Sequence, residues 1–403
     1  MKKLLLLLTV VIAGCGGGGS SPEPAVKNTI LSAAPAVLCN VASSIPLAGY
    51  TGAYAIPTPT QRLNTNIQRS IGFKDYGTSN NCAYAAALDK MQADGVDRVW
   101  IYNYGVWDDF DKEVWTITGW QISRSTFTYI VNEAKKRNIK VFLSLQFTSV
   151  DSKDKSLPYG SDISAALLTK MLASHKKTIT EYTTYGETIG LSGVSLDWNS
   201  FHIPNMHEHS ELWATSMVST ANAIRSNFSG TITYGQIGWP FYDKRIYDAV
   251  DELHLGLSQV AEDGLTATEN ANISVPLLKE KYSALIKLYA QYLNNPTKPV
   301  IFEVATQSRN DYFLNGWTED GFCVNNCIQN SYVTDFSIQA IGIEAQLQAI
   351  AAQTSFVTKS VNFHSSYWLT DTLTPGPEGF PNLSQSIRGK PAEILVKYWF
   401  GRG

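Results

Sequence analysis

The sequence has almost no net charge with which to attract a charged partner. Its 403 residues include 32 Lys and Arg against 35 Asp and Glu, a formal net charge of −3 at pH 7. Proteins that bind nucleic acid offer a basic surface to the phosphates, and this chain has no excess of basic residues to build one. The composition therefore argues against nucleic acid as the main partner. With 44% hydrophobic residues, the chain is also too apolar to be disordered.

Long apolar runs are missing too, and the longest one at the N-terminus is short. Lys2 and Lys3 precede the apolar residues 4–12, which are too few to span a bilayer as a helix. Cys15 closes the segment, and the pattern resembles a bacterial lipoprotein signal, in which cleavage precedes the cysteine and lipid is attached to its thiol. A plain secretory signal with an incidental cysteine is the alternative.

This resemblance implies an exported protein that a lipid at Cys15 anchors to a membrane. Gly16 stands where Asp commonly retains lipoproteins at the inner membrane, so we expect the outer membrane or cell surface. We divide the chain into a signal peptide (1–14), a segment with Cys15, a Gly- and Ser-rich tether and an irregular N-terminal wrap (15–70), and one large domain (71–403).

Cysteine is scarce, with five residues in the chain. An even number beyond Cys15 in an exported protein favours disulfides over a metal site. Cys323 and Cys327 are close enough to close one loop, which makes Cys39 and Cys82 the natural second pair. A zinc site of four thiolates needs closer paired spacing. We therefore predict no metal and no cofactor.

The motifs of nucleotide and serine-hydrolase chemistry are absent. At the first predicted strand, residues 72–77 read GFKDYG, which is no GxGxxG fingerprint. The chain has no P-loop and no GxSxG with a following Asp and His. Nucleotide-dependent and serine-hydrolase activities are therefore unsupported.

What the sequence does have is a repeated alternation of strand and helix patterns. The predicted strands are residues 71–76, 98–104, 140–147, 193–199, 231–237, 252–258, 299–306 and 361–369. The main predicted helices are residues 125–137, 163–190, 212–226, 275–293, 335–352 and 391–400. Many strands are apolar almost throughout, as in sheets that helices cover on both faces. Eight strands in this order predict a single-domain (β/α)8 TIM barrel of the α/β class.

Polar and aromatic residues stand where these strands end, which is where barrel enzymes carry their active sites. They include Lys74, Asp75, Asn103, Tyr104, Gln146, Asp197, Trp198, Asn199, Trp239, His254, Glu303, His364 and Trp368. Amides and carboxylates hydrogen-bond hydroxyl groups, and indole rings offer flat apolar faces. The set therefore indicates a polyhydroxylated substrate, such as an oligo- or polysaccharide.

Glu303 gives the sharpest signal, because residues 298–303 read KPVIFE, a strong strand that runs into a charge. A buried Glu is costly unless it is paired or hydrogen-bonded. The segment resembles the seventh strand of clan A glycoside hydrolases, most closely family 113, the β-mannanase-like group. Residues 231–234 with Trp239, and residues 386–393 with 398–400, resemble the fifth strand and the closing helix of that family.

The resemblance covers roughly residues 70–400 and implies a retaining glycosidase that cleaves β-linked, mannan-like glycans. We expect the protein to be a monomer. Glu303 would be its nucleophile, and Trp368 the aromatic platform under the reactive sugar. The other strand-end residues would bind substrate: Asn199, Trp198, Trp239, Asn103, Tyr104, Gln146, His254, Lys74 and Asp75.

The chain departs from the family at the fourth strand, where the acid/base glutamate belongs. The best alignment puts Asn199 at that position, and an amide is no proton donor of the required kind. Asp197 is the first candidate, because it stands two residues earlier and side chains alternate along a strand. The alternatives are Glu208 or Glu211 in the following loop, or no acid at all. In the last case the protein would be a non-catalytic, glycan-binding lipoprotein on a degenerate barrel.

Overall fold

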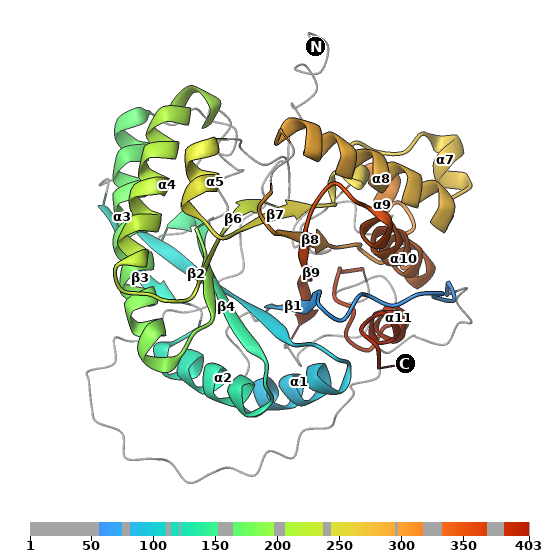
Figure 1. Cartoon of the computed structure of the whole chain (residues 1–403), viewed down its shortest axis with the longest axis horizontal. Coiled ribbons are helices and arrows are strands. Elements are labelled where there is room, and N and C mark those ends of the chain that lie inside the picture. The colour runs from blue at the N-terminus through green and yellow to red at the C-terminus, as the bar shows by residue number, and fades with distance from the viewer. Residues whose placement is uncertain are drawn as a thin grey trace.

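A ring of parallel strands with helices around it forms the centre of the molecule (Figure 1). The computed structural model describes residues 56–74, 81–109, 114–120, 122–151, 164–196, 206–236, 243–294, 297–316, 333–368 and 383–402. The signal peptide and residues 15–55 of the next segment lie outside these ranges. Of the five cysteines, only Cys82 lies within them, so the two disulfide pairings stay predictions.

The barrel strands are β1 (Gln68–Lys74), β2 (Arg98–Asp109), β4 (Lys140–Asp151), β5 (Gly193–Ser195), β6 (Thr231–Gln236), β7 (Glu252–Gly256), β8 (Val300–Val304) and β9 (Thr358–Trp368). They follow the order β1-β9-β8-β7-β6-β5-β4-β2, and β1 also pairs with β2, which closes the ring. All of these pairings are parallel. The predicted (β/α)8 barrel is confirmed, and each predicted strand overlaps one barrel strand.

Among the described residues, one strand lies outside the barrel, and it was not predicted. β3 (Val114–Trp120) pairs antiparallel with the C-terminal part of β2, with Gly105 opposite Trp120. β2 therefore continues beyond the barrel as one arm of a hairpin at the end of the barrel where the active site is expected.

The six main predicted helices are all present. They are α2 (Arg124–Lys136), α3 (Ala165–Ile189), α4 (Ser210–Arg225), α8 (Val275–Tyr292), α10 (Phe336–Ala352) and α11 (Pro391–Trp399). The sequence did not predict α1 (Asn81–Ala93), nor the short helices α5 (Lys244–Ala249), α6 (Gln259–Glu262), α7 (Ala267–Ala271), α9 (Tyr312–Asn315) and the 3-10 helix η2 (Met206–His209). In α1 the alanines on both faces weaken the amphipathic contrast on which a prediction depends.

Local chemistry fixes several helix ends. The side chain of Ser164 accepts a hydrogen bond from the backbone of Leu167 at the start of α3, and Gly190 ends that helix at a φ of 75°. Asp335 accepts from the backbone N–H groups of Ser337 and Ile338 at the start of α10. Such side chains satisfy backbone groups that a helix terminus leaves without a partner.

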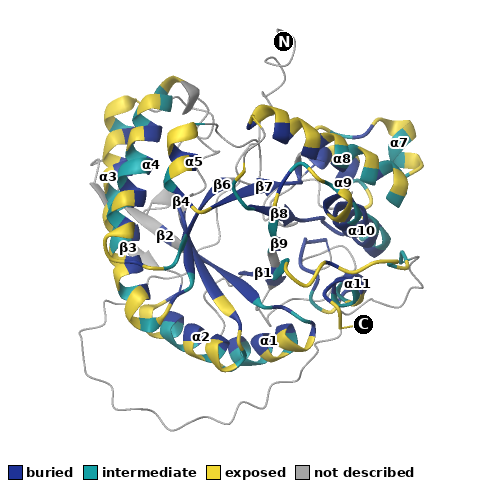
Figure 2. Cartoon of the chain, in the orientation of Figure 1, coloured by how far each residue is buried: buried dark blue, intermediate teal, exposed yellow. Residues whose placement is uncertain are grey.

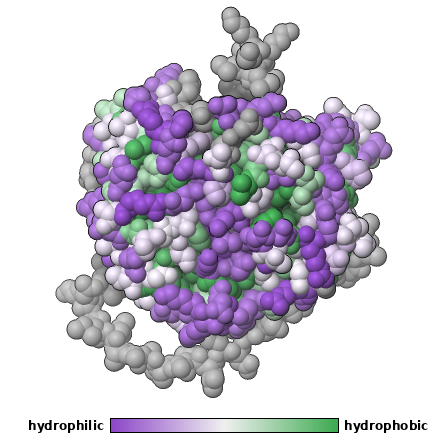
Figure 3. Space-filling model, viewed as in Figure 1, coloured by the Kyte–Doolittle hydropathy of each residue, from purple (hydrophilic) through white to green (hydrophobic). Residues whose placement is uncertain are grey.

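Burial follows the two layers of the fold (Figure 2), with buried strands inside and helices that expose their outer faces. On the face that Figure 3 shows, hydrophilic residues predominate and hydrophobic ones form small groups between them. Among the residues described, no helix is long and apolar enough to cross a membrane. The chain just before β1 packs against the last helix, since the backbone N–H of Leu63 donates to the carbonyl of Trp399.

Candidate active site

The alternation of side chains along each strand sorts the barrel interior into layers. On β2, Arg98, Trp100 and Tyr102 point inward, whereas Val99 and Ile101 join the core under the helices. Arg98 is the first residue of β2 and therefore marks the N-terminal end of the barrel. Tyr102 lies two inward positions further along, toward the end where active sites of this fold occur.

An apolar layer separates the two ends. Trp100, Tyr102, Phe142 and Ile301 form one buried cluster from three strands. The rings of Trp100 and Phe142 lie 5.1 Å apart. Polar groups that lie above this cluster, toward the C-terminal ends of the strands, are therefore screened from the polar groups at the base.

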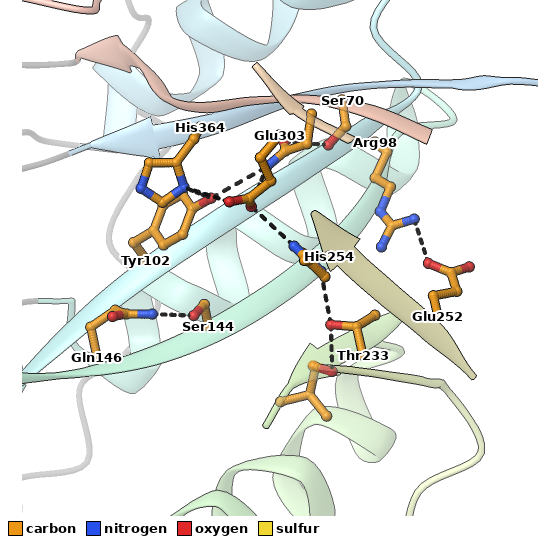
Figure 4. Close-up of polar contacts among 12 residues, drawn as sticks. Ser70, Arg98, Tyr102, Ser144, Gln146, Thr233, Glu252, His254, Glu303 and His364 are labelled. Carbon is orange, nitrogen blue, oxygen red and sulfur yellow. Dashed lines mark hydrogen bonds and ion pairs between the residues drawn. The ribbon is translucent and has the colours of Figure 1, made fainter. Parts of the chain in front are cut away.

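Glu303 lies above this layer, and groups from the neighbouring strands hold it (Figure 4). Its side chain is 6% exposed. Oε1 lies 3.0 Å from Nδ1 of His254 on β7, and it accepts a hydrogen bond from Nδ2 of Asn362 on β9 at 3.2 Å. Oε2 lies 3.6 Å from Nδ1 of His364, also on β9. The sequence predicted that a buried Glu303 would need a partner, and the structure provides three: two histidines and an amide.

Asn362 is itself fixed by further contacts. Nδ2 donates to the hydroxyl of Tyr102 at 3.3 Å as well as to Glu303, and Oδ1 accepts from Oγ of Ser70 at 2.9 Å. The two N–H groups and the carbonyl of this amide all have partners. Its orientation is therefore set, and with it the orientation of the carboxylate that it binds.

His254 uses both of its ring nitrogens inside the protein. Nε2 lies 3.0 Å from Oγ1 of Thr233, while Nδ1 faces Glu303. The edge of the ring packs against Trp100, with centroids 4.9 Å apart. An ionised carboxylate only accepts hydrogen bonds, so Nδ1 carries the hydrogen. His254 therefore holds Glu303, and its predicted contact with substrate stays a prediction.

The surroundings of Glu303 decide its charge. Burial by itself raises the pKa of this carboxyl, but the charge of His364 and the hydrogen bonds from His254 and His364 outweigh burial, and the pKa lies well below its ordinary range. Glu303 is consequently ionised at neutral pH. Such a group suits a nucleophile or an electrostatic stabiliser, and it is unsuited to donate a proton.

Two of the other predicted residues, Gln146 and Asn103, have side chains that the structure describes. Gln146 lies in the barrel, where its amide donates to Oγ of Ser144. Asn103 points the other way, toward the helices, and its amide binds both the N–H and the carbonyl of Ile122. Asn103 thus stabilises the chain before α2 rather than facing the site, because it alternates with the inward-facing Tyr102.

The remaining predicted residues are not placed. Lys74, Tyr104 and Trp368 belong to barrel strands, but the structure does not describe their side chains. Asp75, Asp197, Trp198, Asn199 and Trp239 lie outside the described residues altogether.

The alternative acid Glu211 has a different partner. It lies in the first turn of α4, where both of its oxygens bind the guanidinium of Arg245 at 2.8 and 2.9 Å. Hydrogen bonds from Arg245 and Thr215 lower the pKa of the Glu211 carboxyl. An ionised, paired carboxylate is a poor proton donor, so the structure argues against Glu211 as the acid. Within the described ranges, no group of three or more His, Cys, Asp or Glu side chains is arranged to hold a metal ion.

Tyr102, Asn362 and His364 are the residues of this site to which the sequence assigned no role. The available signal was the period of two along β9, which places Asn362 and His364 on the inward face. Nothing in the sequence showed that Glu303 would be their common partner, because that depends on the alignment of Glu303 with Asn362 across two strands.

Comparisons with solved structures find the fold of this barrel in several glycoside hydrolases. A GH113 β-1,4-mannanase matches with a TM-score of 0.58 at 13% identity, over 84% of this chain and 99% of that one. The GH113 β-mannanase of Alicyclobacillus acidocaldarius, in complex with ManMIm, gives 0.54 at 15% identity, over 83% and 96%. GH5_18 from Streptomyces cattleya, in complex with GlcNAc, gives 0.52 at 14%, over 84% and 81%. The sequence matches no family model and no curated protein. At these identities the likeness establishes the fold.

Proposed function

We propose that this protein is a retaining glycoside hydrolase that cleaves β-linked, mannan-like glycans, with Glu303 as the nucleophile. The observation that carries the proposal is the buried, ionised carboxylate of Glu303 near the C-terminal end of β8. The same barrel in the mannanase structures supports the choice of substrate class.

The two oxygens of Glu303 have different tasks in this mechanism. Oε1 takes the hydrogen bonds of His254 and Asn362, which leaves Oε2, beside His364, as the attacking atom. An electron pair of Oε2 forms a bond to the anomeric carbon while the bond to the glycosidic oxygen breaks, and that oxygen takes a proton from the acid/base group. A water molecule then gives a proton to the same acid/base group and attacks the anomeric carbon, which releases the carboxylate. Two inversions at one carbon retain its configuration.

The acid/base group in this proposal is Asp197. Ser195 is a buried residue of β5 whose neighbours Val194 and Leu196 belong to the outer core, so Ser195 faces the barrel interior. Residue 197 lies outside the described residues, and the alternation of side chains along the sequence is the reason for proposing that it faces the same way. The ionised state of Glu303 and the pairing of Glu211 with Arg245 remove two other carboxyls from this role.

Replacement of Asp197 tests this assignment. We expect Asp197→Asn to lower the turnover of a polysaccharide by at least about 100-fold, since general acid catalysis contributes on the order of 10²–10⁴. The first step on an aryl glycoside with a good leaving group needs no proton and should lose much less. Initial rates on both substrate types measure the difference. An unchanged rate on the polysaccharide would remove Asp197 and leave Glu208 as the carboxyl to replace next.

A second candidate function is glycan binding without cleavage, which Asn199 at the family's acid/base position favours. One screen separates the two. The full chain, purified in detergent, is incubated with β-mannan, glucomannan and other β-glycans, and reducing ends and binding are measured in the same wells. Released reducing ends support the hydrolase, whereas binding without release supports the sugar-holding barrel. If neither occurs with any glycan, both functions are wrong.

We also propose that a lipid at Cys15 anchors the protein to the outer membrane or the cell surface. The N-terminal pattern of two Lys residues, a short apolar segment and Cys15 supports this. Cells grown with labelled palmitate should yield labelled protein, and Cys15→Ser should abolish the label and release the chain from the membrane fraction. Equal labelling of both proteins would contradict the anchor.

Peptide mapping without reduction tests the pairs Cys39–Cys82 and Cys323–Cys327.

A further inference from the structure

His364 has a position that none of the predicted roles explains. It lies on β9, beside the strand of Glu303, and its side chain is 15% exposed against 6% for Glu303 and 5% for His254. Its Nδ1 atom faces two oxygens at once: the hydroxyl of Tyr102 at 2.8 Å and Oε2 of Glu303 at 3.6 Å (Figure 4). His364 is thus the more exposed of the two histidines that approach Glu303.

The groups around Nδ1 determine which atom carries a hydrogen there. Glu303 is ionised and only accepts, and a nitrogen lone pair facing Oε2 at this distance would repel it. The hydroxyl of Tyr102 receives a hydrogen bond from Asn362 and has a second acceptor site for an N–H. Both neighbours therefore favour a hydrogen on Nδ1, directed between Tyr102 and Glu303.

The contact with Tyr102 also fixes the plane of the imidazole. The two rings meet edge to face, with centroids 4.7 Å apart, so the hydrogen bond and the ring packing act together. Tyr102 belongs to the buried cluster on the inner wall of the barrel, which gives the pair a rigid base.

We propose that His364 is a positioning residue that keeps the attacking oxygen of Glu303 ionised and correctly directed, and that Tyr102 holds His364 in place for this task. This inference rests on the proposed function and deepens it. His254 and Asn362 restrain Oε1, whereas His364 acts on Oε2, the atom that must leave its resting contact and bond to the sugar. Among the residues that the structure describes, the titratable groups next to this carboxylate and its partners are Tyr102 on β2, His254 on β7 and His364 on β9.

The sign of the effect on pH dependence follows from charge. The positive charge of His364 is one of the causes that lower the pKa of Glu303. Without it, Glu303 takes up a proton at a higher pH. The acid limb of the kcat/KM profile, where activity falls because the nucleophile is protonated, then moves to higher pH.

Three variants separate charge from orientation. His364→Asn keeps a polar atom near the position of Nδ1 but carries no charge, His364→Ala removes both, and Tyr102→Phe removes only the hydroxyl that holds the ring. We expect His364→Ala to lower kcat about 100-fold, as a misplaced reacting group does. We expect His364→Asn to recover part of that loss and to share the shift of the acid limb, about one to three pH units upward. Tyr102→Phe should give a smaller change in the same direction.

Tyr367→Phe is the matched control for Tyr102→Phe. Tyr367 is on β9 too, but it belongs to the outer core, where it packs against Phe73. Loss of that hydroxyl should leave the acid limb where it is in the parent protein. If kcat falls in the His364 variants while the acid limb stays in place, His364 is merely structural and the inference is wrong.

A measurement that needs no turnover keeps this inference separate from the proposed function. The chain is labelled with carbon-13 at the glutamate side-chain carboxyl, and the Glu303 signal is assigned by its loss in Glu303→Gln. Its titration midpoint should be higher in His364→Asn than in the parent protein. Equal midpoints would overturn the inference even in an active enzyme. A raised midpoint in a protein that cleaves no glycan would support the effect of His364 on Glu303 and contradict the proposed glycoside hydrolase activity.

Discussion

Glu303→Gln should abolish the turnover of every glycan that the protein accepts. We expect a loss of at least about 10⁴-fold in kcat, the size of effect seen when a covalent nucleophile is removed. The amide has the same shape as the carboxylate, and its oxygen still accepts the hydrogen bonds that His254 and Asn362 give to Oε1. The site is therefore kept while its attacking electron pair is lost. Release of reducing ends from β-mannan measures the effect.

The binding of glycans is the internal control for this variant. Because the change is isosteric, Glu303→Gln should bind the substrate within a few-fold of the parent protein, and its unfolding transition should remain cooperative. Full activity with intact binding would show that the nucleophile is another residue. Loss of binding together with activity would point to misfolding, and Glu303→Asp, which keeps the charge but withdraws the carboxylate, would then decide the question.

The second large effect concerns the ion pair at the base of the barrel. Arg98 on β2 and Glu252 on β7 come from opposite sides of the ring, and Nη1 lies 2.9 Å from Oε2. The two side chains are 0% and 6% exposed. Gln68 accepts a further hydrogen bond from Nη1 at 3.0 Å, and the guanidinium stacks on Phe142 at 3.4 Å from the ring centroid. Burial lowers the pKa of Arg98, and Glu252 opposes that effect.

Arg98→Met should lower the free energy of unfolding by about 3–5 kcal/mol, because it leaves the Glu252 carboxylate buried without its partner. Urea unfolding followed by tryptophan fluorescence measures the loss. The double variant Arg98→Met with Glu252→Leu should recover most of it, since replacing both charges removes the cost of desolvation as well as the attraction. If the single and double variants are equally destabilised, packing around Phe142, and not the unpaired charge, explains the loss.

The barrel was predictable because its strands carry a signal that depends on few neighbours. Parallel strands that helices cover are buried on both faces, so segments such as VWIYNY and KVFLSL are apolar without alternation. Helices with one apolar face alternate with them, and closure of the ring follows from their number and order. β3 was not predicted because it pairs antiparallel with β2 and lies outside this repeat. α1 was not predicted because alanines occupy both of its faces.

The candidate site was predictable in part. A glutamate at the end of an apolar strand is costly unless it has partners, so Glu303 stood out on physical grounds alone. The sequence did not show that Asn103 would bind the backbone of Ile122, because a position near a strand end does not say which face a side chain takes. The contact of His254 with Glu303 was also missed, since a histidine at a strand end is compatible with either role.

The sequence by itself determined the (β/α)8 repeat and the carboxylate on which the proposed chemistry depends. Only the tertiary structure decided the state of that carboxylate. His254 and Asn362 lie 49 and 59 residues from Glu303 along the chain, and they meet its Oε1 atom because β7, β8 and β9 are neighbours in one closed ring. Alternation sets which side chains enter the ring, but strand alignment and closure set which of them meet. The ionisation of Glu303 is therefore a property of the barrel and not of any segment within it.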